Sequence, residues 1–219
     1  MKVKLDLHTH IWEAFGFQPP SLSIAEKVMA QIKARGIDGI AITDHHNKEW
    51  AIQFRELVER HFPGQAIIIP GWEIEVRPAS NPFSEYQVAE LFLPGGGVFR
   101  IYCHPGYYSP HILIEDGIHA IEIDNYIHNW HIRQAQVEEI ARAHSLLTVR
   151  VSDAHTLENI GLRYTEVEME ELYRRAGSPA ALLPSSGVQG AKPLPGPGVF
   201  PDDSSSSPSP EGGRGGPRG

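Results

Sequence analysis

Apolar residues in the first 175 positions fall into short runs whose internal spacing alternates between a strand period and a helix period. Val3, Leu5 and Leu7 alternate with polar residues, which is typical of a strand. Six more strand-like runs follow, at residues 37–43, 66–69, 88–93, 98–103, 118–123 and 146–151. Helical spacing predicts a helix that ends at Arg35 and is capped by Ser21 or Ser23, and further helices at residues 48–61, 130–144 and 166–175. The alternation of the two kinds of segment predicts an α/β fold with a largely parallel sheet.

This pattern stops near residue 176. From Gly177 to Gly219, 27 of 43 residues are Gly, Pro or Ser. Such a composition cannot bury enough apolar surface to offset the entropy cost of ordering the chain. We therefore predict one folded domain at residues 1–176 and a disordered Gly/Pro/Ser-rich tail at residues 177–219.

Composition and charge narrow the class of protein. The formal net charge of −8 gives no basic footprint for nucleic acid, so we expect a nucleic-acid partner only as a nucleotide or oligonucleotide substrate. No apolar segment approaches the roughly 18 residues of a membrane span, and no charged-then-apolar leader opens the chain. The single cysteine excludes an internal disulfide and suits a reducing compartment. These features predict a soluble, cytoplasmic protein without a membrane partner.

Histidines and carboxylates recur where the strand-like runs stop. His8 and His10 have i, i+2 spacing after the first run, and Asp153 and His155 repeat that spacing after the last. Strand side chains alternate between faces, so each pair points one way. Imidazoles and carboxylates together suit zinc, manganese or iron. The candidate metal ligands are His8, His10, His45, Glu73, His104, Asp153 and His155.

Each of these residues also has an ordinary explanation. A lone histidine after a strand is more often a hydrogen-bonding loop residue than a ligand, and Asp153 could cap a helix. Glu73 could be solvated, and Glu75 lies on the same strand face. Seven such coincidences at strand ends favour a metal centre over seven separate explanations. Cys103 follows apolar residues and is read as a buried thiol rather than a nucleophile.

Five motifs occur in the order shown by the PHP family, the polymerase and histidinol phosphatase family, and residues 1–175 resemble it. The resemblance implies a distorted (β/α)7 barrel whose strand ends hold two or three divalent metal ions, with zinc, manganese and iron as candidates. The motifs are Asp6-x-His8-x-His10, Thr43-Asp44-His45, Pro70-Gly71-x-Glu73, His104-Pro105 and Ser152-Asp153-Ala154-His155.

The resemblance also implies a division of the ligands among the metals. The first metal would be bound by His8, His10, Glu73 and Asp153; Glu73 would bridge to a second metal, held by His104; and a third would be held by His45 and His155. Two positions depart from the family pattern. Phe15 stands where many members carry an Asp or His of the third site, and Glu13 is a nearby substitute. The last ligand of the second metal is either Asn125 or His128.

By the same resemblance, the protein would be a metal-dependent phosphoesterase. It would hydrolyse a small phosphomonoester or nucleotide phosphoester by a metal-activated water, with Glu73, Asp153 and His155 as the catalytic candidates. Two alternatives stay open: a structural or regulatory metal site, and a metal-dependent hydrolase of a substrate other than a phosphoester. Four arginines are candidate phosphate clamps, and their spacing selects none: Arg77, Arg133, Arg150 and Arg163.

Overall fold

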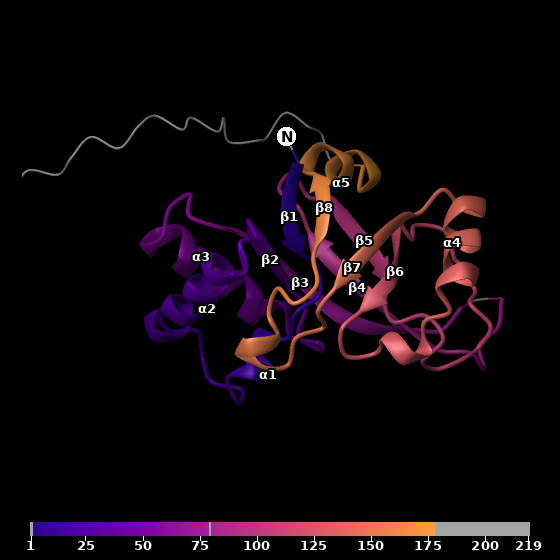
Figure 1. Ribbon diagram of the computed structural model, residues 1–219, viewed down its shortest axis with the longest axis horizontal. Helices are drawn as coiled ribbons and strands as arrows, with labels where there is room; N and C mark the ends of the chain where they lie inside the picture. Colours follow the sequence, from indigo (N-terminus) through magenta and orange to yellow (C-terminus); the bar gives the residue numbers. More distant parts are fainter. Residues whose placement is uncertain (1, 79, 178–219) are drawn as a thin grey trace, which may run out of the picture. The chain divides into compact units, whose positions relative to one another are not determined.

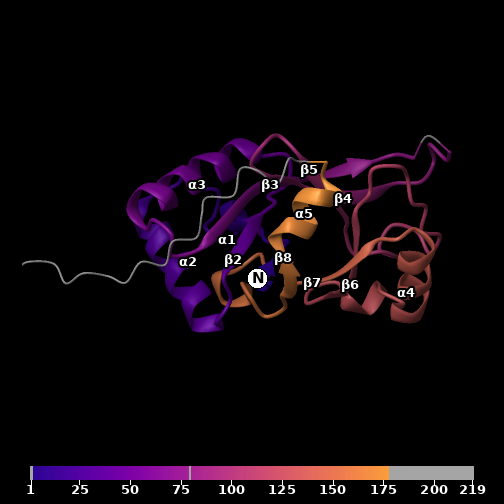
Figure 2. The same ribbon diagram turned by 90° about the horizontal axis from the view of Figure 1, so that it is seen from above.

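The computed structural model describes residues 2–78 and 80–177. Except for Gly177, the predicted tail lies outside the described residues. Eight strands form one mixed sheet in the order β7-β6-β5-β4-β3-β2-β1-β8, nearly closed into a barrel (Figures 1 and 2), which confirms the predicted barrel. The strands are β1 (Lys2–Asp6), β2 (Gly39–Ile42), β3 (Ile67–Val76), β4 (Tyr86–Phe92), β5 (Val98–Tyr102), β6 (Ala120–Asn125), β7 (Leu147–Val151) and β8 (Thr165–Glu168).

The sheet is less parallel than the alternating pattern predicts. β1, β2 and β3 pair in parallel, as do β5, β6 and β7. Between these halves β4 runs antiparallel to both neighbours, and β8 runs antiparallel to β1. Short connections from β3 to β4 and from β4 to β5 suffice for this antiparallel arrangement, because antiparallel neighbours need no crossover helix.

Main-chain hydrogen bonds beyond the strand ends bring β7 back to β1. Thr9 and Ala154 form an isolated parallel bridge. The Asp153 N–H donates to the His8 carbonyl at 2.9 Å, and the His10 N–H donates to the Ala154 carbonyl at 2.9 Å. The first and last histidine motifs of the sequence therefore meet at one end of the barrel.

The helices cover two sides of the sheet. In Figure 2, α2 and α3 lie beside β2 and β3, and α4 lies beside β6 and β7. Ser21 caps α2 by accepting a hydrogen bond from the Ile24 N–H, and Gly36 ends it in the left-handed conformation. None of the described helices is long and apolar enough to cross a membrane. The α-helices are α1 (Ile11–Ala14), α2 (Leu22–Arg35), α3 (Lys48–His61), α4 (Gln134–Ala143) and α5 (Met169–Arg175), with 3-10 turns η1 (Asn129–His131) and η2 (Leu157–Asn159).

Two predicted helices have different starting points in the structure. The helix expected at residues 166–175 begins at Met169, because residues 165–168 form β8, in which buried Val167 alternates with exposed glutamates. The helix expected at residues 130–144 begins at Gln134, since the backbone at Ile132 is extended and only a 3-10 turn precedes it.

β3 is longer than its apolar run and carries Glu73 in its interior rather than at its end. The strand passes through Pro70 and Gly71, where β2 stops, and continues as the partner of β4. Gly71 allows this close approach, because a Cβ there would lie 2.5 Å from the Glu90 carbonyl oxygen. Glu73 is 1% exposed and faces the end of the barrel where the other strands stop.

Candidate metal centre

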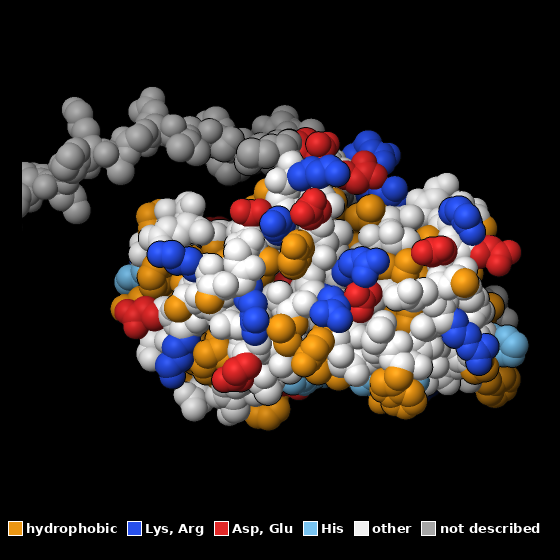
Figure 3. All heavy atoms as spheres, viewed as in Figure 1, with side chains coloured by type: hydrophobic (Ala, Val, Ile, Leu, Met, Phe, Trp, Pro, Cys, Tyr) orange, Lys and Arg blue, Asp and Glu red, His pale blue; other side chains and the backbone are white. Residues whose placement is uncertain are grey.

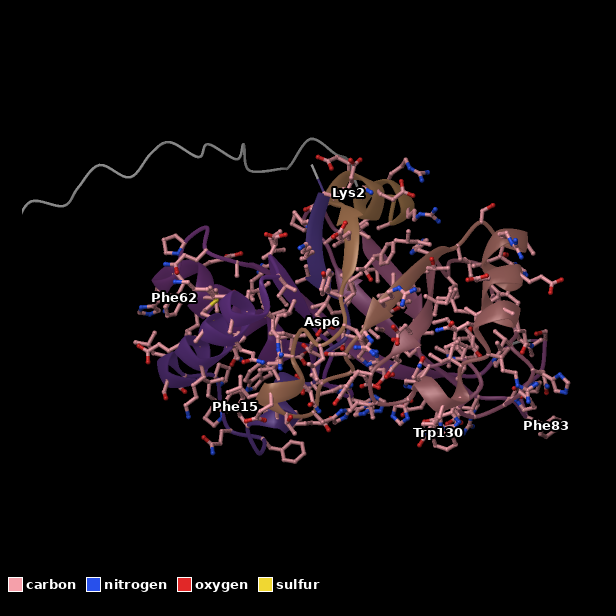
Figure 4. The ribbon with its side chains drawn as sticks, viewed as in Figure 1. Lys2, Asp6, Phe15, Phe62, Phe83 and Trp130 are labelled. Carbon is pink, nitrogen blue, oxygen red and sulfur yellow. The ribbon has the colours of Figure 1, made fainter. Side chains whose placement is uncertain are left out.

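The side chains predicted as ligands come from β3 and from the segments after β1, β2, β5 and β7, and they meet at one end of the barrel. In Figure 1 this is the end toward which β1 runs, beside α1 and away from α5. Figure 4 labels Phe15 and Trp130 along this edge of the molecule. Histidine side chains reach the surface along the same edge in Figure 3, where positive and negative side chains are otherwise interspersed.

His8, His10 and Asp153 form the buried middle of the site. The two Nε2 atoms lie 3.0 Å apart, and His10 Nε2 lies 3.1 Å from Asp153 Oδ1. His8 Nε2 lies 3.6 Å from the same carboxylate oxygen. Asp153 holds this position with a left-handed backbone, φ 54°, a conformation that is uncommon outside glycine. Two ring nitrogens and one carboxylate oxygen therefore face a common point.

Glu73 contacts four imidazoles, which come from the segments after β1, β2 and β5. Its Oε1 lies 3.1 Å from His104 Nε2. Its Oε2 lies 3.2 Å from His45 Nδ1, 3.6 Å from His8 Nε2 and 3.7 Å from His10 Nε2. The two oxygens thus face two different groups of nitrogens, which is the geometry that a carboxylate bridging two cations needs.

Glu13 belongs to a third, more open group. His45 Nε2 lies 3.9 Å from Glu13 Oε1, and His155 Nε2 lies 3.5 Å from Glu13 Oε2. The short helix α1, in a stretch without a predicted element, places Glu13 there. Its first turn is held by Asp44, whose two carboxylate oxygens accept hydrogen bonds from the N–H groups of Trp12 and Glu13. Phe15 packs instead against the apolar cluster that contains α2 and α3.

The structure separates the roles of Asn125 and His128. The Asn125 amide donates to Glu122 Oε2 and to Asp153 Oδ2, and its oxygen accepts from the N–H groups of Ile127 and His128. The His128 ring lies 4.9 Å from the His104 ring, centre to centre, and its Nε2 lies 3.7 Å from Asp153 Oδ2. The amide nitrogen and oxygen of Asn125 are both engaged in hydrogen bonds within the protein. His128 is therefore the side chain with a nitrogen available beside His104.

The carboxylates and imidazoles of the centre shift each other's pKa values. Burial opposes a charge on His8, but Asp153 and the other nearby acids raise its pKa well above the usual range. Burial likewise opposes a charge on His10, and hydrogen bonds to Asp153 and Glu13 outweigh it and raise the pKa to about 9. The histidines hold the pKa of Glu73 well below its usual range despite burial. Without a metal, protons on the histidines therefore balance the carboxylates.

No Lys or Arg supplies that balance within residues 2–78 and 80–177. No lysine or arginine side chain there forms a hydrogen bond or ion pair with Glu13, Glu73, Glu122 or Asp153. Buried carboxylates need a nearby positive charge. A divalent cation would supply it in place of the histidine protons, and the imidazole and carboxylate donors suit zinc, manganese or iron.

Several residues that the sequence suggested as phosphate clamps have other partners in the structure. Arg150 and Arg163 both bind Asp124, and Arg77 binds Glu85, so these three candidate clamps are held by carboxylates elsewhere. Cys103 is buried, and burial raises the pKa of its thiol, which agrees with the prediction that it is no nucleophile.

Glu122, fully buried in β6, was not predicted as a site residue. The sequence did hold a signal for it, since it is an acidic residue between Ile121 and Ile123 in an apolar run.

Comparison with known proteins identifies solved structures that share this fold. No protein-family model and no curated protein matches the chain. A provisionally assigned metal-dependent phosphoesterase from Bifidobacterium adolescentis superposes with a TM-score of 0.59 at 13% identity, over 78% of this chain and 96% of that one. An amidohydrolase from Chromobacterium violaceum with bound sulfate and no metal gives 0.53 at 14% identity, over 78% and 96%. PsfC from Pseudomonas syringae gives 0.50 at 17%, over 73% and 79%. At these identities the likeness establishes a shared fold.

Proposed function

We propose that this protein is a metal-dependent phosphoesterase that hydrolyses a small phosphomonoester or a nucleotide phosphoester. The observation that carries the proposal is the position of Glu73. Its buried carboxylate lies between two groups of imidazoles, with oxygens 3.1 Å from His104 and 3.2 Å from His45. The fold shared with proteins named as a metal-dependent phosphoesterase and an amidohydrolase supports a hydrolase.

We infer that the side chains of the centre could serve as ligands at three cation positions. Glu73 takes part in the first two, and Glu13 completes the third in place of Phe15. The first position is lined by His8, His10, Glu73 and Asp153; the second by Glu73, His104 and His128; and the third by Glu13, His45 and His155. The third group is the most exposed, with His45 at 35% and His155 at 36%.

Divalent ions bound here would lower the pKa of a water molecule and stabilise negative charge on the phosphate oxygens. The protein side chains fix the places at which such ions would bind. Glu73, on β3, and Asp153, after β7, are both buried, and each directs a carboxylate oxygen at the centre. His155 has one free ring nitrogen, because its Nδ1 donates to the Asp153 carbonyl at 2.9 Å.

That single free nitrogen gives His155 one of two roles. Its Nε2 either binds the third cation or exchanges a proton with the leaving oxygen, since one lone pair cannot do both at once. The number of bound ions therefore decides the role. If only the two buried positions are occupied, His155 would be left for proton transfer; if the third is occupied as well, His155 would be a ligand beside Glu13.

A second candidate is a metal-dependent hydrolase of an amide or other acyl substrate. The observation that favours it is the absence of lysine and arginine from the centre in the described part of the chain, since a phosphate dianion is commonly held by such side chains. One of the proteins that share the fold is named as an amidohydrolase. A structural or regulatory metal site is the remaining alternative.

Metal analysis followed by a substrate screen tests these possibilities. We expect at least two equivalents of zinc, manganese or iron per chain, and turnover of 4-nitrophenyl phosphate or a nucleotide that chelation abolishes. Metal content well below one equivalent after loading would contradict the metal centre. Bound metal with hydrolysis of N-acyl amides but no phosphoester would favour the second candidate, and bound metal without turnover would favour a structural site.

A further inference from the structure

Glu122 is a buried carboxylate that joins three parts of the centre without facing the cation positions. It lies in β6 and is 0% exposed. Its Oε1 lies 2.7 Å from His8 Nδ1. Its Oε2 accepts hydrogen bonds from the His104 backbone N–H at 2.7 Å and from the Asn125 amide at 2.8 Å. Both oxygens are therefore engaged, on two sides of the centre.

The contact with His8 decides which ring nitrogen faces the centre. A carboxylate only accepts hydrogen bonds, so Nδ1 of His8 carries the shared proton and Nε2 is the nitrogen left to bind a cation. Nε2 is also the atom that lies 3.0 Å from His10 Nε2 and 3.6 Å from Glu73 Oε2. A second hydrogen bond of this kind fixes the tautomer and orientation of metal-binding histidines in general.

The contact with His104 supports an unusual backbone. His104 has φ 25°, a value that non-glycine residues rarely adopt, and its N–H points to Glu122. This conformation leaves His104 Nε2 3.1 Å from Glu73 Oε1. Asn125 extends the network, because its amide also donates to Asp153 Oδ2 at 3.1 Å.

We propose that Glu122 is a positioning residue that couples the first and second cation positions, by fixing the His8 tautomer and the His104 backbone together. The inference rests on the metal centre proposed above and is independent of the substrate. His8, Cys103 and Glu122 have potential ligand atoms within 4.8 Å of one another. A cation among them would have to break the 2.7 Å contact between His8 and Glu122, so the positioning role fits this group better.

Glu122→Gln tests the coupling, since an amide has one acceptor oxygen where the carboxylate has two. If that oxygen faces His104 and Asn125, the amide N–H₂ faces His8 Nδ1 and forces the His8 proton onto Nε2. If that oxygen faces His8, the N–H₂ group faces two other donors, the His104 N–H and the Asn125 amide, and cannot accept a hydrogen bond from either. Each arrangement breaks one of the two contacts directly, and because Glu73 is shared by the two positions, we expect a 10–100-fold loss of zinc affinity at both, measured by competition with a chromophoric chelator.

Glu90→Gln is the matched control. Glu90 is also a strand glutamate with both oxygens engaged, by Trp72 Nε1 at 2.8 Å and by Arg100 Nε at 2.8 Å, away from the centre. The control should keep zinc affinity within threefold of the unmodified protein. A second readout is the downfield proton signal that we expect from His8 Nδ1 in NMR spectra, because Nδ1 lies 2.7 Å from Glu122 Oε1. Glu122→Gln should shift or remove this signal, and Glu90→Gln should keep it.

Glu122→Asp keeps the charge and both acceptors on a side chain one methylene shorter, and should recover part of the affinity. If Glu122→Gln does not fold, Glu122→Asp must weaken zinc at both positions more than Glu90→Asp does. Unchanged affinity and an intact Nδ1 signal in Glu122→Gln would overturn the inference, as would a loss confined to one position. Metal binding without phosphoester turnover would refute the proposed function and leave this inference standing, whereas a protein that binds no metal would overturn both.

Discussion

At the scale of single residues, Glu73 is the side chain on which the two proposed buried cation positions would depend. A carboxylate can hold two cations at close spacing while it offsets their repulsion, whereas an imidazole nitrogen binds one. Glu73→Gln keeps the size of the side chain and removes its charge. We expect this variant to lose more than one equivalent of metal and all phosphoester turnover, as measured by elemental analysis and a 4-nitrophenyl phosphate assay.

Glu75→Gln is the control for this variant. Glu75 lies on the same face of β3 two residues later, but it pairs with His46 at 2.8 Å and is about one-third exposed. Its substitution should leave metal content unchanged. His155→Ala, at the open third group, should keep part of the metal and of the turnover. Full metal content and activity in Glu73→Gln would show that Glu73 does not bridge the two positions.

At the scale of elements, the short helix α1 is held in place by a residue outside it. Asp44 accepts hydrogen bonds from the N–H groups of Trp12 and Glu13 at 3.1 and 3.0 Å, and so orients the carboxylate of the third group. Asp44→Ala should destabilise the fold by about 1 kcal/mol, the typical effect of losing a helix cap. It should also weaken the third cation position, seen as a loss of the most weakly bound metal in a titration.

Ser21→Ala provides a comparison for Asp44→Ala, because it removes a cap of α2 that has no contact with the centre. Chemical denaturation should show a similar loss of stability for both variants. The metal titration should distinguish them, since only Asp44→Ala displaces Glu13. Identical titrations would mean that α1 keeps its position without the Asp44 contacts.

At the scale of the whole molecule, bound metal should control stability in a pH-dependent way. In the metal-free protein the pKa of His10 is raised to about 9 from 6.5. The stability that this protonated histidine contributes is therefore complete below pH 6.5 and is lost as the pH rises toward 9. Metal binding replaces such protons and strengthens as they leave. The difference in melting temperature between loaded and chelator-stripped protein should widen from pH 6.5 to 9; a constant difference would contradict this linkage.

The tail prediction also belongs to the whole molecule, and it concerns residues outside the described part of the chain. Ala176 still packs against the apolar core below α5. A truncation after Gly177 keeps that contact and removes the Gly/Pro/Ser-rich segment. We expect a change in melting temperature below about 2 °C, which corresponds to less than about 1 kcal/mol for a domain of this size, and unchanged metal content. A loss of several degrees would show that the segment stabilises the domain.

The local pattern of the sequence was enough to predict an α/β fold with a largely parallel sheet and to select the residues that meet at one end of it, whereas the barrel was predicted from the resemblance to the PHP family. Period-two runs such as Val3–Leu7 and helical runs such as 48–61 are determined by neighbours in the chain, so they can be found without tertiary information. The same holds for the histidines and acids placed where such runs stop, because parallel strands end on one side of a sheet. Seven candidates chosen this way lie together in the structure.

Tertiary structure alone decided how those residues are connected. Glu73 lies inside β3 because that strand outlasts β2 and finds a new partner in β4, which no local pattern encodes. β8 pairs with β1 between residues 160 or more positions apart in the sequence, and this long-range pairing overrides the helical spacing that continues into α5. Glu13 reaches the centre through a contact with Asp44, 31 residues away. Glu122 acquires its three partners only when β1, β5 and β6 come together, since hydrogen bonds between distant segments depend on the folded arrangement.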